Sequence, residues 1–206
     1  MDCLKLNIKT TDNVYIPSED SYLIMDLLSE FIEKIDKTNL SILDMGCGTG
    51  ILGMCLASNK KAKKVTFADI SPDAIKLTKE NIISNKSHIL AETKVIQSDL
   101  FSTIGNKDFD IISFNPPYLP NEDNKELMKD AFYGGWSGIE TTKRFLLEAK
   151  DHLAKNGAVF IVASSLSDIT SLFRYAQALG FKILLEKKQH IFFEDIVAIS
   201  FGLNDK

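Results

Sequence analysis

The 206-residue sequence has few cysteines, no long hydrophobic run and no excess of positive charge. The three cysteines, Cys3, Cys47 and Cys55, are odd in number and form no Cys-x-x-Cys pair. They therefore predict neither a disulfide framework nor a zinc site built by this chain alone, and they favour a reducing compartment. The longest apolar run, AVFIVA at 158–163, is far shorter than the ~20 residues that span a bilayer. The N-terminus also has no apolar leader segment. We therefore expect a cytoplasmic protein without a membrane span.

The charge balance is slightly acidic, with 24 Lys and Arg against 28 Asp and Glu, a net charge of -4 and a pI near 5.4. Proteins that grip nucleic acid through its phosphates usually carry a basic face and a high pI. Nucleic acid is therefore an improbable main partner. The 45% hydrophobic and 25% charged residues are typical of a globular chain, and the absence of repeats, linkers and low-complexity segments predicts one domain, residues 1–206.

The apolar pattern predicts alternating strands and helices. An N-terminal extension and helix occupy 1–37, because Leu23, Leu27, Phe31 and Ile35 repeat at helical spacing after Ser18, a candidate N-cap. Strands are predicted at 41–45, 65–69, 94–99, 109–114 and 158–163, and a helix that ends near Asn59 is predicted between the first two. A helix from Ser71 and Pro72, one from Ile139 through Leu153 to a C-cap at Gly157, and one at 168–179 follow from the same pattern. The last two strands, at 181–190 and 193–202, have no helix between them and must be antiparallel.

A glycine-rich turn follows the first strand, with the sequence DMGCGTG at 44–50. Gly46, Gly48 and Gly50 let the backbone turn tightly and let a ligand approach the main chain. The spacing is GxGxG, so the dinucleotide fingerprint GxGxxG is not met, and no Walker lysine follows.

Acidic residues end the first three strands and predict a nucleoside site. Asp69 can accept hydrogen bonds from both ribose hydroxyls, and Asp99 from an adenine amine with Leu100 against the ring. Asp44 would repel pyrophosphate but suits a cationic amine. Ribose, adenine and an ammonium without phosphate describe S-adenosylmethionine. Each acid taken alone could simply cap a turn or a helix.

The tetrapeptide Asn115-Pro116-Pro117-Tyr118 follows the fourth strand, at the sheet edge where open α/β folds bind ligands. The prolines fix the backbone and remove donors. The Asn115 amide oxygen and the Pro116 carbonyl remain as acceptors for a planar NH₂ group, and Tyr118 offers a flat face. Two acceptors would aim the nitrogen lone pair at a sulfonium methyl. The long segment 115–138 is expected to be functional.

These motifs resemble the amino-methyltransferases of the class I S-adenosylmethionine-dependent superfamily. The resemblance implies a Rossmann-like α/β fold: a seven-stranded, mostly parallel sheet in the order 3-2-1-4-5-7-6, with the last strand antiparallel and helices on both faces. The segment VYIPSEDSY at 14–22 and YGGWSG at 133–138 resemble the short HemK-like branch of eukaryotes and archaea.

That branch implies N5-methylation of the glutamine in the Gly-Gly-Gln motif of a class 1 translation release factor. The resemblance places Ser21, Asp44, Gly46, Asp69, Asp99 and Leu100 at the cofactor, and 115–118 at the substrate amide. It further implies a small zinc-binding activator subunit as heterodimer partner. Few residues precede Val14, so the helical substrate domain of the bacterial branch is expected to be absent.

Two other functions stay open. An N6-adenine or N2-guanine methyltransferase acting on RNA or DNA shares the chemistry of Asn115. A non-catalytic scaffold would keep the fold while losing turnover, although the intact acceptor motif argues against it. No metal site is expected. The role of Trp136, to contact substrate or to pin its loop, also stays open.

Overall fold

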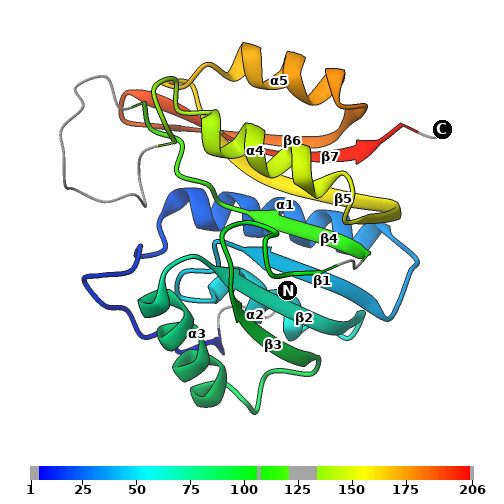
Figure 1. Ribbon diagram of the computed structural model, residues 1–206. Helices are drawn as coiled ribbons and strands as arrows, with labels where there is room; N and C mark the ends of the chain where they lie inside the picture. The colour runs from blue at the N-terminus through cyan, green and yellow to red at the C-terminus, as the bar shows by residue number, and fades with distance from the viewer. Residues whose placement is uncertain (1–4, 106–107, 121–133, 205–206) are drawn as a thin grey trace.

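In the described residues, seven strands form one sheet in the order β3-β2-β1-β4-β5-β7-β6. The computed structural model describes residues 5–105, 108–120 and 134–204 (Figure 1). The strands are β1 (Leu40–Met45), β2 (Ala62–Asp69), β3 (Glu92–Gln97), β4 (Phe109–Phe114), β5 (Leu153–Ser164), β6 (Phe181–Ile191) and β7 (Glu194–Leu203). β7 runs antiparallel to both β5 and β6, and the other neighbours are parallel. The expected strand order and the antiparallel last strand are confirmed.

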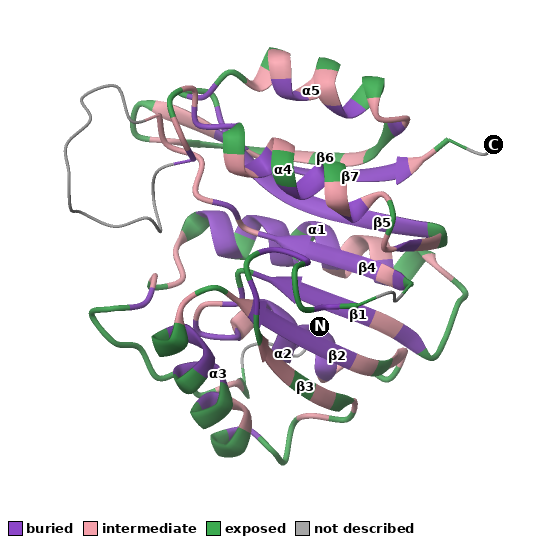
Figure 2. Ribbon diagram, in the orientation of Figure 1, coloured by how far each residue is buried: buried purple, intermediate pink, exposed green. Residues whose placement is uncertain are grey.

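Helices cover both faces of this sheet, which makes three layers (Figure 1). One face carries α1 (Glu19–Lys34), α2 (Ile51–Ala57) and α3 (Pro72–Ser84), and the other carries α4 (Glu140–Ala149) and α5 (Ile169–Ala178). Figure 2 shows the central strands buried along most of their length, as expected for strands covered on both sides. No helix of the described residues is both long and apolar enough to cross a membrane.

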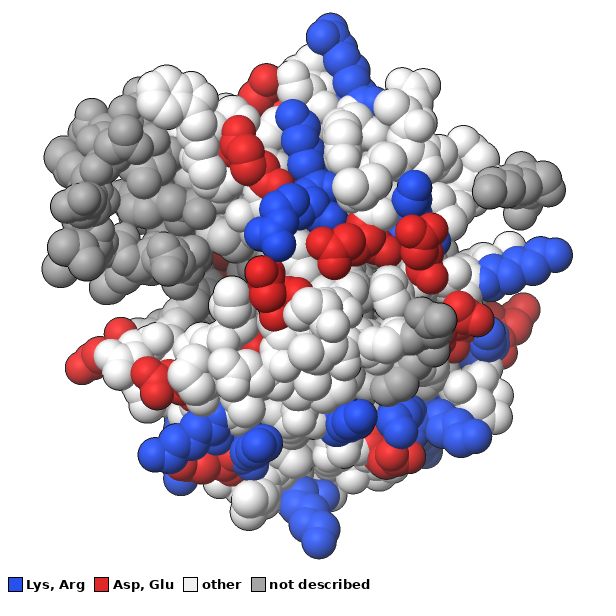
Figure 3. Space-filling model, in the orientation of Figure 1, with Lys and Arg blue, Asp and Glu red and all other residues white. Residues whose placement is uncertain are grey.

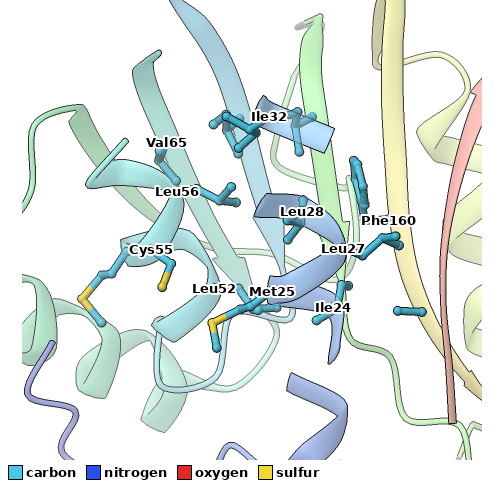
Figure 4. Close-up of a cluster of buried hydrophobic side chains, with 14 of the residues drawn as sticks. Ile24, Met25, Leu27, Leu28, Ile32, Leu52, Cys55, Leu56, Val65 and Phe160 are labelled. Carbon is cyan, nitrogen blue, oxygen red and sulfur yellow. The ribbon is translucent and has the colours of Figure 1, made fainter. Parts of the chain in front are cut away.

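Alternate residues of the central strands belong to different hydrophobic clusters. Ile42 of β1 packs with α1 and α2, whereas its neighbour Leu43 packs on the α4 and α5 side. Figure 4 shows the first cluster, with Leu27 of α1, Leu56 of α2 and Phe160 of β5. Each such side chain contributes about 2 kcal/mol on full burial, so the apolar stripe of α1 is what fixes this helix on the sheet.

The two ends of α1 are stabilised by side chains other than the expected cap at Ser18. Ser18 is the N-cap residue, but its side chain caps no backbone N–H of the helix and contacts the Glu19 carboxylate instead. At the other end, the Lys61 ammonium donates to the carbonyls of Ile32 and Ile35 at 2.8 and 2.6 Å. A cation there is favourable because the last carbonyls of a helix have no intrahelical partner.

The helix predicted to extend from Ile139 to Gly157 is wrong at its C-terminal end. Leu153 begins β5 and pairs with Phe109 of β4, so its helical spacing is coincidental. Gly157 lies within β5, and its φ is not in the left-handed region that a C-cap requires. A Cβ at Gly157 would lie 2.9 Å from the Phe109 carbonyl oxygen, so this glycine allows close strand approach.

The cysteines also differ from expectation. Cys55 is disulfide-bonded, although the cysteine pattern predicted no disulfide. Sequence spacing could not reveal this, because a disulfide depends on distances between Cβ atoms in the folded chain. Cys47 is free and buried, and burial raises the pKa of its thiol well above the usual range. Cys47 is therefore an unreactive side chain at neutral pH.

Candidate active site

The predicted site residues lie where the parallel strands end. Met45 of β1 is paired with Ala68 of β2 and with Phe114 of β4. The glycine turn after β1, Asp69 at the end of β2 and Asn115 after β4 are therefore neighbours along one edge of the sheet. This is the edge at which open α/β sheets bind ligands.

The three glycines of the turn all have positive φ, at 60°, 53° and 82° for Gly46, Gly48 and Gly50. Only glycine adopts such angles without strain. A Cβ at Gly46 would lie 2.8 Å from the Phe114 ring, so this position is closed by packing. A Cβ at Gly48 would be in ordinary contact with Val14 at 3.8 Å, so packing does not require a glycine there, whereas the positive φ favours one.

Helix α3 holds the turn from one side. The Thr78 hydroxyl donates to the Gly48 carbonyl at 2.9 Å, and the Asn81 amide donates to the Thr49 carbonyl at 2.9 Å. Both side chains are buried. These bonds hold the carbonyl groups of the turn against α3. The chain itself therefore fixes the conformation of the turn.

The same helix also binds the N-terminal segment. Asn81 accepts from the Lys9 N–H and donates to the Lys9 carbonyl, at 2.9 and 3.0 Å. Asn85 does the same for Asn7, at 2.8 and 2.9 Å. The two side chains replace a neighbouring strand, and they carry the chain toward Val14, which packs against α3. The sequence reading missed this anchor.

Asp69 is tied to the turn. Its carboxylate accepts from the Gly48 N–H and the Ser71 N–H, both at 2.9 Å. Burial raises the pKa of Asp69. Each carboxylate oxygen can accept more than one hydrogen bond, so hydroxyl donors of a ligand still find acceptors here.

Asp44 is fully buried beneath the turn. It accepts from the Gly53 N–H at 2.9 Å and from the Ser113 hydroxyl at 3.1 Å. Burial raises its pKa to about 7, and the negative charge of Asp69 adds to the shift. We call Asp44, the turn 46–50 and Asp69 the glycine-loop cluster.

Asp99 does not end β3 as expected, because the strand ends at Gln97. Its exposed carboxylate pairs with Arg144 of α4 at 3.3 Å. The next residue, Leu100, is buried with a positive φ of 44°, and its carbonyl accepts from the Ser98 hydroxyl at 2.7 Å. This tight turn is what separates an exposed acid from a buried apolar neighbour.

Asn115 contacts Asp20 at the start of α1, a residue to which the sequence analysis gave no role of its own within the segment VYIPSEDSY. Asp20 is 2% exposed, and one of its oxygens accepts from Tyr15 at 2.9 Å, from Asn115 at 3.0 Å and from Tyr118 at 3.1 Å. Ser21 lies 3.4 Å from the Asn115 amide nitrogen. We call Asp20, Tyr15, Asn115 and Tyr118 the Asp20 cluster.

The Asn115 side-chain oxygen is buried and has no hydrogen-bond partner. An unsatisfied buried acceptor costs about 1–3 kcal/mol. The Asn115 oxygen shares this property with His152 Nδ1 among the described residues, but only Asn115 lies at the carboxyl end of the parallel strands, where a ligand donor can reach it. Pro116 beside it is buried, and Pro117 and Tyr118 are half-buried.

Two glycines after this segment pack against its backbone. A Cβ at Gly134 would lie 2.3 Å from the Pro117 carbonyl oxygen, and one at Gly138 would lie 2.4 Å from that of Tyr118. Trp136 between them is 69% exposed, so burial of its ring does not pin the segment. Tyr133 and residues 121–132, part of the long segment expected to be functional, lie outside the described residues.

The structure therefore brings Ser21 and 115–118 together as one group, and Asp44, the glycine turn and Asp69 as another. Asp99 and Leu100 follow β3, the neighbour of β2. Asp20 is the site residue that the sequence analysis did not identify. Its position in the segment VYIPSEDSY, which carries the family resemblance, was the signal that could have identified it. Within 5–105, 108–120 and 134–204, no three His, Cys, Asp or Glu side chains are grouped as a metal site would need.

Solved structures that share this fold include several methyltransferases, and also a precorrin 8W decarboxylase and a cyclase, so this likeness shows the fold alone. The Mtq2 chain of the E. cuniculi Mtq2-Trm112 complex, described as responsible for methylating the translation termination factor eRF1, superimposes with a TM-score of 0.71. It is 22% identical, and the match covers 93% of this chain and 99% of that one. The seven-stranded order with an antiparallel last strand is thus that of the class I methyltransferases.

The methyltransferase small domain model matches residues 7–190, and the chain belongs to this family. A protein of Methanocaldococcus jannaschii, named provisionally as a protein N5-glutamine methyltransferase, is 36% identical over 95% of this chain and 94% of its own length. The release factor glutamine methyltransferase of Streptococcus pneumoniae is 32% identical over 78% of this chain. This chain spans 57% of the length of that bacterial relative.

Proposed function

We propose that this protein transfers a methyl group from S-adenosylmethionine to the side-chain amide nitrogen of the glutamine in the Gly-Gly-Gln motif of a class 1 translation release factor. The observation that carries the proposal is the Asn115 oxygen, a buried acceptor without a donor. A primary amide supplies the missing N–H. The names of the relatives support the same substrate class.

The glycine-loop cluster fits the proposed cofactor. Gly46 of the turn is exposed, and Asp69 keeps acceptor capacity for ribose hydroxyls. Asp99 and Leu100 would take the adenine amine and ring, and Ser21 and Asp44 would favour the amino-acid end. The cofactor supplies a methyl group activated by a sulfonium. Because carboxylates line the cluster, a cationic ligand is favoured over a phosphate.

The reaction then needs orientation more than a base. Asn115 and the Pro116 carbonyl accept the two amide hydrogens, so the nitrogen lone pair faces the methyl group. With the cofactor bound, the methyl group would pass to the amide nitrogen, the neutral thioether would leave with the electron pair of the S–C bond, and water would take the proton that the nitrogen loses. Correct in-line geometry supplies most of the acceleration. Pro116, Pro117 and Tyr118 hold that geometry rather than exchange protons.

A protein substrate also agrees with the surface. Figure 3 shows Lys and Arg interspersed with Asp and Glu on the face that it displays, rather than gathered into a basic track. We further propose that residues 1–206 act as one methyltransferase domain in the cytoplasm, with a small zinc-binding activator subunit. The relative solved as a complex with Trm112 supports such a heterodimer.

The test is methyl transfer from labelled S-adenosylmethionine to a purified class 1 release factor and, separately, to total RNA, with and without a co-expressed activator subunit. We expect label in the release factor at the Gly-Gly-Gln glutamine. The Asn115→Ala variant should lose about 10²- to 10³-fold in kcat. Its cofactor affinity should change by less than about 3-fold. Asp26→Asn, on the exposed side of α1, is the matched control. Label found in RNA would contradict the protein substrate and favour an adenine or guanine amine.

A further inference from the structure

The orientation of the Asn115 amide is decided by Asp20. An ionised carboxylate only accepts hydrogen bonds, so the group that faces it at 3.0 Å must be the amide NH₂. The opposite orientation would place two acceptor oxygens against each other. The amide oxygen is consequently turned away from Asp20, and it is this oxygen that has no partner.

Two tyrosines keep Asp20 in its place. The Tyr15 and Tyr118 hydroxyls both donate to the same oxygen that Asn115 contacts. Burial, followed by the charge of Asp20, raises the pKa of both hydroxyls, so both remain protonated donors at physiological pH. The other Asp20 oxygen accepts from the Ser21 backbone and hydroxyl. The carboxylate therefore cannot rotate without losing several of these bonds.

We propose that Asp20 is a positioning residue for the methyl acceptor: it locks the Asn115 side chain with its oxygen toward the substrate amide, and Tyr15 and Tyr118 hold Asp20 for this task. The inference rests on the proposed function and deepens it. Asp20 contacts the amide nitrogen of Asn115 rather than its free oxygen, so it acts through Asn115. Without Asp20, the Asn115 amide would sample both orientations, and only one of them accepts a substrate N–H.

Asp20→Asn is the first variant to test, because it keeps the shape of the side chain. The introduced amide can turn either its oxygen or its nitrogen toward Asn115, so the lock is lost. We expect kcat to fall about 10- to 100-fold, because misorientation of a positioning group acts on the chemical step. The KM for release factor should stay within about 3-fold. The control is again Asp26→Asn, which removes an equal charge from the same helix; Asp26 is exposed and pairs with Lys187 at the surface.

A reciprocal exchange separates orientation from folding. Asn115→Asp alone places two carboxylates about 3 Å apart, and we expect a loss of about 10³-fold in kcat, since like charges in contact force one to take up a proton. Adding Asp20→Asn restores one charge, an N–H donor between the two side chains and an acceptor oxygen toward the substrate. The double variant should recover at least about 10-fold over Asn115→Asp. If Asp20 had only a structural role, the kcat of the double variant should not recover.

The outcomes are distinct for the two proposals. If the wild type methylates the release factor but Asp20→Asn keeps its kcat, or the exchange gives no recovery, the positioning role is overturned and the proposed function stands. If the wild type methylates no release factor, the proposed function fails. The positioning role is then tested by the hydrogen-exchange rate of the Asn115 side-chain NH₂, measured by ¹⁵N NMR. A slowly exchanging NH₂ that becomes fast in Asp20→Asn supports the lock, and an unchanged exchange rate contradicts it.

Discussion

The glycine-loop cluster and the Asp20 cluster lie at the ends of neighbouring strands but are completed in opposite ways. In the first, the chain satisfies its own acid groups: Gly53 and Ser113 donate to Asp44, and Gly48 and Ser71 donate to Asp69. In the second, the donors are all consumed by Asp20, and the Asn115 oxygen is left without one. The comparison shows that the chain itself supplies donors to both acids of the first cluster, whereas the proposed substrate would supply the donor for the Asn115 oxygen of the second.

The largest expected effect on stability comes from disturbing the packing around the glycine-loop cluster. A Cβ at Gly53 would lie 2.2 Å from the Phe67 ring and 2.9 Å from an Asp44 carboxylate oxygen. We expect Gly53→Ala to lower the free energy of unfolding by about 3 kcal/mol, measured in urea. Gly105→Ala is the control, because Gly105 has a φ of +71° but nothing within 4 Å of an added Cβ. It should lose only about 1 kcal/mol. Equal losses would mean that the cluster is not closely packed.

The buried carboxyl group of Asp44 in the same cluster should make the free energy of unfolding depend on pH. The pKa of Asp44 is raised from 3.8 to about 7, so the folded protein keeps a proton that the unfolded chain releases. Stability is therefore highest below pH 4 with respect to this group and falls as the pH rises to about 7. Asp44→Asn should flatten the curve of unfolding free energy against pH over this interval. A curve of unchanged slope would show that Asp44 is ionised in the folded protein.

The smallest effect is expected at the exposed edge of the proposed nucleoside site. Arg144 pairs with Asp99 across 3.3 Å, with side chains 60% and 51% exposed. Arg144→Ala should change the free energy of unfolding by less than about 0.5 kcal/mol, because exposed ion pairs contribute little. Calorimetric titration should show S-adenosylmethionine binding tighter by up to about 3-fold, since Asp99 is released for the adenine amine. Weaker binding would place Arg144 itself among the ligand contacts.

Much of the fold and of the glycine-loop cluster could be predicted because their signals are local. Apolar strands, a GxGxG turn and acids after successive strands are all visible in the sequence, and Pro72 after Ser71 correctly marked the start of α3. Leu153 shows the limit. It continues the apolar spacing of α4, yet its pairing with Phe109 of β4 assigns it to β5. Long-range strand pairing outweighs a helical pattern of a single further residue.

The Asp20 cluster could be predicted only in part, because it joins residues 95 positions apart. Asn115 was identified from the two prolines that follow it, and Ser21 from the opening motif. An acid such as Asp20 is common in the first turn of a helix, because the helix dipole favours negative charge there. The local sequence therefore gives no sign of its contact with Asn115. Nor does any local pattern show that Asn81 and Asn85 bind the N-terminal segment.

The position of α1 also has a consequence for how the protein folds. This helix is made first, yet it packs against β7, and Lys187 of β6 bonds to Asp26 at a separation of 161 residues. Contacts so distant along the chain close slowly, since a long loop must be ordered before they form. During synthesis, α1 can complete its packing only after β6 and β7 have left the ribosome. The acceptor geometry at Asn115, which depends on the position of α1, therefore depends on residues made at the far end of the sheet.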